Sequence, residues 1–315
     1  MNEIFIKELQ EAYEARDLAR LQSFSQPAYR KINKRNDYRS VLMLSCNNIK
    51  HLSKIEMLSA ECIMLNLEDG VSKEEKPFAL VLCGIFLSKL QKCHKKLVVR
   101  VNSLDTTGYD EIAYLNQYMP DAIRVPKIRT AKEIDRVLEL LHDDIELHLS
   151  IETKEAWHNL TTLKRDKKIK AFYLGVLDLY ADIGLSQHFI QRNNPTLLYM
   201  LSHFFLTCKV MDVKPISFVY QEYKDLEGFR EWLYLERSIG FDAKGCITPA
   251  QVELVNEVFD YDSKDIKRAK EIVELFEQKR SEGITGFTHE EYGFIDEPIY
   301  KGALALLKNK KEDMR

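Results

Sequence analysis

The sequence predicts a (β/α)₈ barrel, that is, eight parallel strands that close on themselves and alternate with helices. Eight short β-like runs alternate with longer helical stretches between residues 39 and 262, a length that suits one such barrel. No glycine-rich phosphate loop follows the first run, which disfavours the alternative of a doubly wound open sheet.

The strand candidates are short apolar runs bounded by polar or turn-forming residues. They lie at residues 40–44, 62–67, 97–101, 122–126, 147–152, 171–175, 215–219 and 245–247. The last run is the weakest because it has only three residues. Helical patterns separate them, such as "EEKPFALVLCGIFLSKLQK" and "AKEIDRVLELLHDD".

Two segments flank the predicted barrel. Residues 1–38 are charged, contain one helical stretch and are interpreted as an extension outside the main fold. Residues 263–315 hold a long helix, a turn-rich stretch and a last helix, "IYKGALALL". This tail is too apolar for a loose terminus. We therefore expect a helical tail or lid that packs on the barrel or reaches a neighbouring subunit.

Composition excludes several classes of function. With 315 residues, 45% hydrophobic residues and a net charge of −3, the chain can bury a full core and offers no electrostatic argument for nucleic acid. No apolar run of about 18 residues is present, so no membrane span is expected. The six cysteines form no CxxC pair and the first residues do not resemble a signal peptide, which favours reduced thiols in a cytoplasmic protein.

Charged residues end several of the apolar runs. Glu68 and Asp69 follow the second run, Arg100 ends the third, Glu152 ends the fifth, and Asp178 follows the sixth. Active sites of (β/α)₈ barrels lie at the C-terminal ends of the strands, so this fold would bring all five side chains to one mouth.

This set has a chemical use. Two or three carboxylates around open positions suit Mg²⁺, which keeps waters and takes its remaining ligands from substrate. An arginine beside the ion can bind a carboxylate through two parallel hydrogen bonds. Together they would bind a 2-keto or 2-hydroxy acid. The alternatives are local roles, with Asp69 capping a helix and Arg100 in a structural ion pair.

Ordered motifs between residues 39 and 305 extend this interpretation. Arg39-Ser40 opens the first strand, "NLEDGVSKEEK" follows the second, and "VRVN", "VPK" and "IET" come next. "GVLDLYADIG", "GFDAKGCITPAQVELVNEVF" and "GFIDEP" complete the series. In these motifs the chain resembles the β subunit of citrate lyase and its relatives, the malyl-CoA and citramalyl-CoA lyases and the HpcH/HpaI-type 2-keto acid aldolases.

The resemblance implies a (β/α)₈ barrel, Mg²⁺ as cofactor and roles for individual residues. Glu152 and Asp178 are expected as metal ligands, and Glu68 and Asp69 as acids that hold metal-bound water. The remaining assignments are Arg100 as the catalytic clamp on the substrate carboxylate, Glu68 as a further catalytic residue, Asp296 as an acid or base that serves a neighbouring subunit, and Arg39 and Lys127 as substrate-binding residues.

Some positions depart from the family pattern. Leu177 stands where a glutamate is common, Asn66 replaces the first acid of the D-L-E-D segment, and Thr248 replaces a histidine. We expect His148 to point away from the barrel centre, and no histidine spacing is typical of a zinc site.

The predicted function is a Mg²⁺-dependent carbon–carbon lyase that cleaves or forms a 3-hydroxy acyl thioester. Its products would be a 2-keto acid and an acyl thioester, carried on CoA or an acyl carrier protein. The resemblance also implies a homo-oligomer, a trimer or hexamer. The alternatives are an aldolase that joins a pyruvate-like enolate to a free aldehyde, and a non-catalytic subunit on a degenerate barrel.

Overall fold

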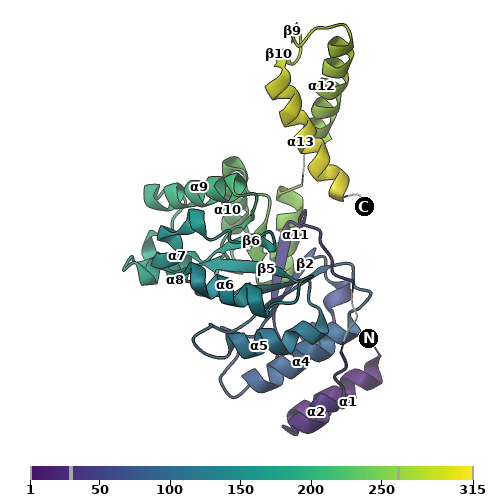
Figure 1. The fold of residues 1–315 in the computed structure, drawn as a ribbon, viewed down its shortest axis with the longest axis vertical. Helices are drawn as coiled ribbons and strands as arrows, with labels where there is room; N and C mark the ends of the chain where they lie inside the picture. Colours follow the sequence, from purple (N-terminus) through teal and green to yellow (C-terminus); the bar gives the residue numbers. More distant parts are fainter. Residues whose placement is uncertain (1, 28–30, 261–262, 314–315) are drawn as a thin grey trace. The chain divides into compact units, whose positions relative to one another are not determined.

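The computed structural model of the chain describes residues 2–27, 31–260 and 263–313 (Figure 1). The chain divides into two compact units, residues 1–259 and 260–315. Each unit is described by itself. Among the described residues, no helix combines the length and the apolar character needed to cross a bilayer.

Unit 1 is a (β/α)₈ barrel, which confirms the predicted fold class. Within its described residues, eight parallel strands form one sheet in the order β7-β6-β5-β4-β3-β2-β1-β8. The strands are β1 (Ser40–Ser45), β2 (Cys62–Asn66), β3 (Lys96–Arg100), β4 (Ala122–Val125), β5 (Glu146–Ile151), β6 (Ile169–Leu174), β7 (Lys214–Ile216) and β8 (Lys244–Cys246).

The sheet closes between its two shortest strands. One parallel bridge joins Ser217, just past β7, to Lys244 of β8. The Lys244 ammonium donates to Glu236 of α10 (Leu226–Ile239) at 2.5 Å, and the Ser217 hydroxyl donates to the same oxygen at 2.7 Å. Lys244 and Glu236 are fully buried, so each charge depends on the other for compensation. This pair fastens the barrel at the point where backbone hydrogen bonds are fewest.

Helices surround the strands (Figure 1). Several of these helices begin with a side-chain cap. At the start of α6, Thr130 and Glu133 form a reciprocal capping box. The helices of unit 1 are α1 (Glu3–Glu14), α2 (Leu18–Ser23), α3 (Ile49–Leu52), α4 (Lys76–Lys89), α5 (Gly108–Leu115), α6 (Ala131–Leu140), α7 (Lys154–His158), α8 (Val176–Asp182), α9 (Pro195–Val210), α10 and α11 (Pro249–Val258).

The described part of the N-terminal extension packs against the barrel's helices. Helix α2 lies on α4, and Leu9, Ala12 and Leu21 are fully buried. Tyr13 stacks edge-on against Phe78 of α4. Helix α4 is apolar on nearly all sides, so it needs cover on its outer face as well as on the face toward the strands.

The inside of the barrel carries charges below the strand ends. The Lys96 ammonium lies 2.6 Å from a carboxylate oxygen of Glu146, and His148 lies 3.5 Å from the same oxygen. The other ring nitrogen of His148 lies 3.4 Å from the hydroxyl of Tyr173, which belongs to the apolar cluster inside the barrel. His148 therefore points into the barrel, and the expectation that it points away is wrong. Along a strand, His148 shares its face with Glu146 and Glu152.

Unit 2 is a helical hairpin with a two-stranded sheet at its turn. It consists of α12 (Ser263–Ser281), β9 (Gly286–His289), β10 (Gly293–Asp296) and α13 (Glu297–Asp313). The two strands pair antiparallel. The two helices pack on a small core made of Ala269, Ile272, Phe276, Ile295 and Ala303.

Burial of His148 makes the stability of the protein depend on pH. Burial, and after it the neighbouring Lys96, lowers the pKa of His148 to about 4, although Glu146 opposes this shift. Between pH 6.5 and 4 the unfolded chain therefore takes up a proton that the folded chain does not. Stability falls as pH is lowered through this window, by about 3 kcal/mol from this residue.

We predict that His148→Asn flattens this part of the stability curve, because asparagine does not titrate. Urea unfolding at a series of pH values measures the slope. An unchanged slope between pH 6.5 and 4 would contradict the assignment of the proton uptake to His148.

Candidate active site at the mouth of the barrel

A pocket of about 250 Å³ opens where the C-terminal ends of the strands meet. Its charged lining comes from five strand ends and the loops that follow them, and its remaining wall is mostly apolar. The charged lining residues are Asp69, Arg100, Arg124, Glu152 and Asp178; the apolar wall includes Met43, Leu174, Val176, Leu177, Phe218, Val219 and Ile247.

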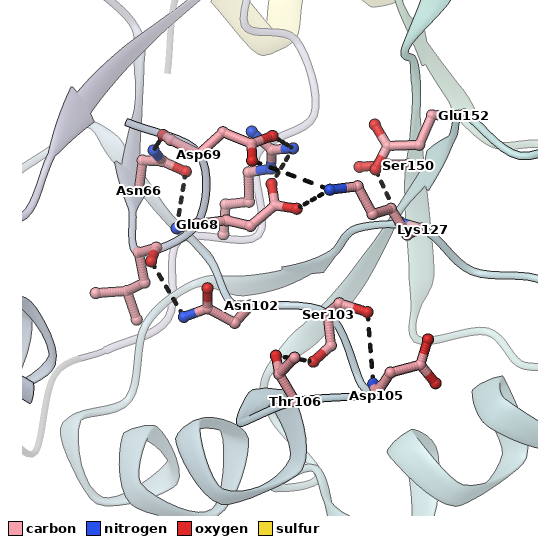
Figure 2. Close-up of polar contacts among 12 residues, drawn as sticks. Asn66, Glu68, Asp69, Asn102, Ser103, Asp105, Thr106, Lys127, Ser150 and Glu152 are labelled. Carbon is pink, nitrogen blue, oxygen red and sulfur yellow. Dashed lines mark hydrogen bonds and ion pairs between the residues drawn. The ribbon is translucent and has the colours of Figure 1, made fainter. Parts of the chain in front are cut away.

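Beside this pocket, Glu68 forms ion pairs with two cations, one at the end of β3 and one just past β4. Its carboxylate is only 4% exposed and pairs with the Arg100 guanidinium on one side. On the other side, the Lys127 ammonium lies 2.8 Å away (Figure 2). Arg100 also donates to Asp69 at 3.3 Å. Burial alone would raise the pKa of Asp69, but Arg100 and Lys127 outweigh this effect and hold the pKa below its usual range.

Glu152 is the most buried acid of the pocket, with 2% exposure. It follows β5 directly, and one carboxylate oxygen accepts from the backbone N–H of Lys127 at 2.8 Å (Figure 2). Lys127 adopts a left-handed φ of 53°, which turns this N–H toward the acid. Burial raises the pKa of Glu152; Arg100 and Arg124 oppose the shift, whereas Glu68 and Asp178 add to it. A bound cation would relieve this destabilised carboxylate.

Asp178 lies in the first turn of α8 and faces the same pocket from its exposed rim. Within residues 2–27, 31–260 and 263–313, no three His, Cys, Asp or Glu side chains are grouped as ligands for a metal. Mg²⁺ does not require three, because it keeps several waters and is commonly held by one or two carboxylates plus substrate. Glu152 and Asp178, two mutually repelling carboxylates on one pocket, fit this ion.

Within unit 1, Arg39 lies apart from this group. Arg39 precedes β1 and lies at the opposite end of the strands, where its guanidinium bonds Glu61 at 2.6 Å and the carbonyl of Asn256 at 3.3 Å. The pocket lies at the C-terminal ends of the strands, so Arg39 does not line it. Asp296 belongs to unit 2, where one carboxylate oxygen accepts from the N–H of Ile299 and caps α13 at 3.2 Å.

One residue of the pocket is missing from the predicted set. Arg124 lies on β4 and is 7% exposed. Its Nε donates to the Ser150 hydroxyl at 2.9 Å, and its guanidinium carbon lies 4.3 Å from the ring centre of Tyr173. Burial, and after it the nearby Arg100, lowers the pKa of Arg124 to about 10, so it stays charged at neutral pH. An arginine inside the apolar run "AIRVP" was the available signal.

Sequence comparison identifies the protein family that this chain matches. The family described as HpcH/HpaI aldolase/citrate lyase matches residues 39–249. The chain is similar to a (3S)-malyl-CoA thioesterase of Cereibacter sphaeroides, with 30% identity over 78% of this chain and 85% of the relative. It is also similar to the citrate lyase subunit beta of Leuconostoc mesenteroides, with 25% identity over 86% of this chain and 92% of the relative.

The fold is similar to that of the Mycobacterium tuberculosis protein CitE, solved in complex with magnesium, acetoacetate and coenzyme A. The TM-score is 0.69 at 20% identity, and the match covers 86% of this chain and 97% of CitE. This likeness supports the barrel architecture.

Gly175 follows β6 directly, and its lack of a side chain lets the backbone approach Glu152 closely. A Cβ atom at this position would lie 2.6 Å from both the Cβ and one carboxylate oxygen of Glu152. We expect Gly175→Ala to displace Glu152 and to weaken Mg²⁺ binding at least tenfold in titration calorimetry, while the protein stays folded.

The matched control is Gly302→Ala, because an added Cβ there meets open space. This control should leave Mg²⁺ binding unchanged. Equal Mg²⁺ affinity in Gly175→Ala and the unmodified protein would show that the close approach does not position Glu152.

Proposed function

The chain belongs to the HpcH/HpaI aldolase/citrate lyase family, and on this premise we propose that it is a Mg²⁺-dependent carbon–carbon lyase. Its substrate would be a 3-hydroxy acyl thioester, which it cleaves to a 2-keto acid and an acyl thioester, or forms from them. The observation that carries this proposal is the convergence of Glu152, Asp178 and Arg100 on one pocket.

Glu152 and Asp178 would hold the ion; the burial of Glu152, which raises its pKa despite nearby Arg100 and Arg124, supports this role. The bound Mg²⁺ would supply Lewis-acid stabilisation of the negative charge that develops on the substrate's oxygen. Glu68 and Asp69 would accept hydrogen bonds from water beside the ion. Lys127 keeps Glu68 in place for this role and, through its backbone N–H, orients Glu152.

Arg100 would bind the carboxylate of the acid component. Its Nε is buried and has no hydrogen-bond partner among the described residues, while its terminal nitrogen is already paired with Glu68 and Asp69. A substrate carboxylate would give this Nε a charge-assisted partner. Lys127 is the second cation that would favour an anionic substrate, although its ammonium is engaged by Glu68.

In the cleavage direction, a base takes the proton of the substrate hydroxyl, and the oxygen becomes the keto oxygen. The bond between the carbinol carbon and the carbon next to the thioester breaks, and its electron pair leaves with the thioester as an enolate. An acid then protonates the enolate carbon. We propose Asp296 of a neighbouring copy in a homo-oligomer for this step, since the family resemblance assigns such a role to an acid in "GFIDEP".

A second candidate function is hydrolysis of the same thioester. The similarity to a (3S)-malyl-CoA thioesterase favours it. Both reactions would use the same bound acid, but hydrolysis breaks the bond between the carbonyl carbon and sulfur. The products therefore decide between the two.

Removal of one carboxylate charge tests the proposed metal ligands. Glu152→Gln keeps the size of the side chain but removes its charge, so we expect Mg²⁺ affinity to fall by at least a hundredfold with the fold intact. Titration calorimetry measures the affinity and circular dichroism checks the fold. Glu227→Gln is the matched control, because Glu227 is exposed and lies outside the pocket lining. Equal Mg²⁺ binding by Glu152→Gln and the control would overturn the ligand assignment.

The proposed reaction gives a second prediction. With (3S)-malyl-CoA and Mg²⁺, the lyase reaction releases glyoxylate and acetyl-CoA, whereas hydrolysis releases malate and free CoA. We expect the first pair by chromatography, although the preferred acid can differ. Asp296→Asn should slow product formation about a hundredfold without loss of stability, because asparagine is an equally good helix cap.

Malate with free CoA would select the hydrolase instead. Turnover of pyruvate with free aldehydes, and of no acyl-CoA ester, would select the aldolase. Full activity of Asp296→Asn would restrict Asp296 to its helix cap.

A further inference from the structure

Arg124 holds a position in the pocket that the reaction proposed above does not use. It pairs in register with Arg100 on the neighbouring strand, and both guanidinium groups line the pocket. Two arginines thus lie side by side on β3 and β4. Neighbouring strands are about 4.8 Å apart, so two anionic groups at the ends of a short molecule could each meet one arginine.

The Arg124 guanidinium is held in place by its neighbours, and the carboxylates of Glu152 and Glu68 act on its charge without forming an ion pair with it. Its Nε donates to the Ser150 hydroxyl at 2.9 Å, and its guanidinium carbon lies 4.3 Å from the centre of the Tyr173 ring, so these two residues hold the group in position. Among the described residues, no carboxylate forms an ion pair with it, and neither terminal nitrogen makes a hydrogen bond to the protein. Arg100 differs, because Glu68 and Asp69 both pair with it.

Arg124 also marks the floor of the pocket. Beneath it lies a separate inner cavity of about 20 Å³, lined mainly by apolar side chains such as Met64, Tyr173 and Cys246. That cavity has room for about one water molecule and none for a ligand. A substrate group that enters past Glu152 and Asp178 therefore ends its path against the Arg124 guanidinium.

A mostly buried cation without a close ion pair is costly, and the planar guanidinium fork can bind a carboxylate through two parallel hydrogen bonds. Resting on the proposed function, we propose that Arg124 is a specificity-determining residue that binds a second carboxylate of the acid component. The chain would then prefer a short 2-keto dicarboxylate over an acid whose far end is hydrogen or an alkyl group. Arg100 and the metal ligands hold the common keto-acid end, and Arg124 reads the other end.

Binding of two stable 2-hydroxy acids tests this inference. (S)-Malate and (S)-lactate share the hydroxyl and the first carboxylate, and only malate carries a second carboxylate. In titration calorimetry with Mg²⁺, we expect the protein to bind malate about tenfold to a hundredfold more tightly than lactate. Arg124→Met, similar in length but neutral, should lose this preference and keep its lactate affinity within about threefold.

Two further variants separate recognition from structural support. Arg124→Lys keeps the charge without the fork and should restore part of the preference. Ser150→Ala removes the hydroxyl that orients Nε and should reduce the preference with little change in the melting temperature. These two variants decide the matter if Arg124→Met does not fold.

The outcomes are distinct. Equal affinity for the two acids, a preference that survives in Arg124→Met, or equal weakening of both acids would overturn the role of Arg124. If lactate still binds in a Mg²⁺-dependent manner in these cases, the proposed function stands. If neither acid binds in the presence of Mg²⁺, the proposed function fails together with this inference.

Discussion

The Glu68 carboxylate lies out of water between Arg100 and Lys127, and this ion triad organises the mouth of the barrel. Removing one member of a buried ion group leaves the others uncompensated, which is strongly destabilising. Lys127 couples the triad to Glu152, because its ammonium binds Glu68 while its backbone N–H binds the second acid. The positions of three strand ends are therefore fixed by one set of charges. Glu152 receives one backbone hydrogen bond and the field of Arg100 and Arg124, but it forms no ion pair with the described residues, which leaves it available to a ligand.

The charged interior is tolerable because the outer faces of the strands form the apolar core and the inner faces hold the polar groups. The large apolar cluster lies between the strands and the helices and contains residues such as Leu65, Val99 and Leu149. That layer supplies most of the buried apolar area on which stability depends. The inner faces carry Lys96, Glu146 and other polar groups, whose mutual pairing offsets the cost of burial. Changes inside the barrel can alter chemistry while the outer layer preserves the fold.

The barrel could be predicted because apolar runs and helical stretches alternate between residues 39 and 262, and even the short β8 was visible. The charges at strand ends were also readable, since parallel strands bring their C-terminal ends to one side. For Arg39, the motif match did not say at which end of its strand the residue lies; here it precedes the strand and bonds Glu61. Arg124 was not predicted as a pocket residue, and His148 was predicted to point away from the barrel centre, because both lie within strands. Alternation indicates which residues share a face, but only the closed sheet shows which face is the lumen.

The first two helices have a consequence for the behaviour of the protein in solution. Helix α4 presents apolar side chains toward α2 as well as toward the strands, and Leu9, Ala12 and Leu21 fill the outer contact. A fragment that begins at residue 39 would expose this apolar face of α4. Exposed apolar patches promote aggregation. The first two helices therefore belong to the same compact unit as the barrel and cover an apolar face of α4 that residues 39 onward would leave exposed.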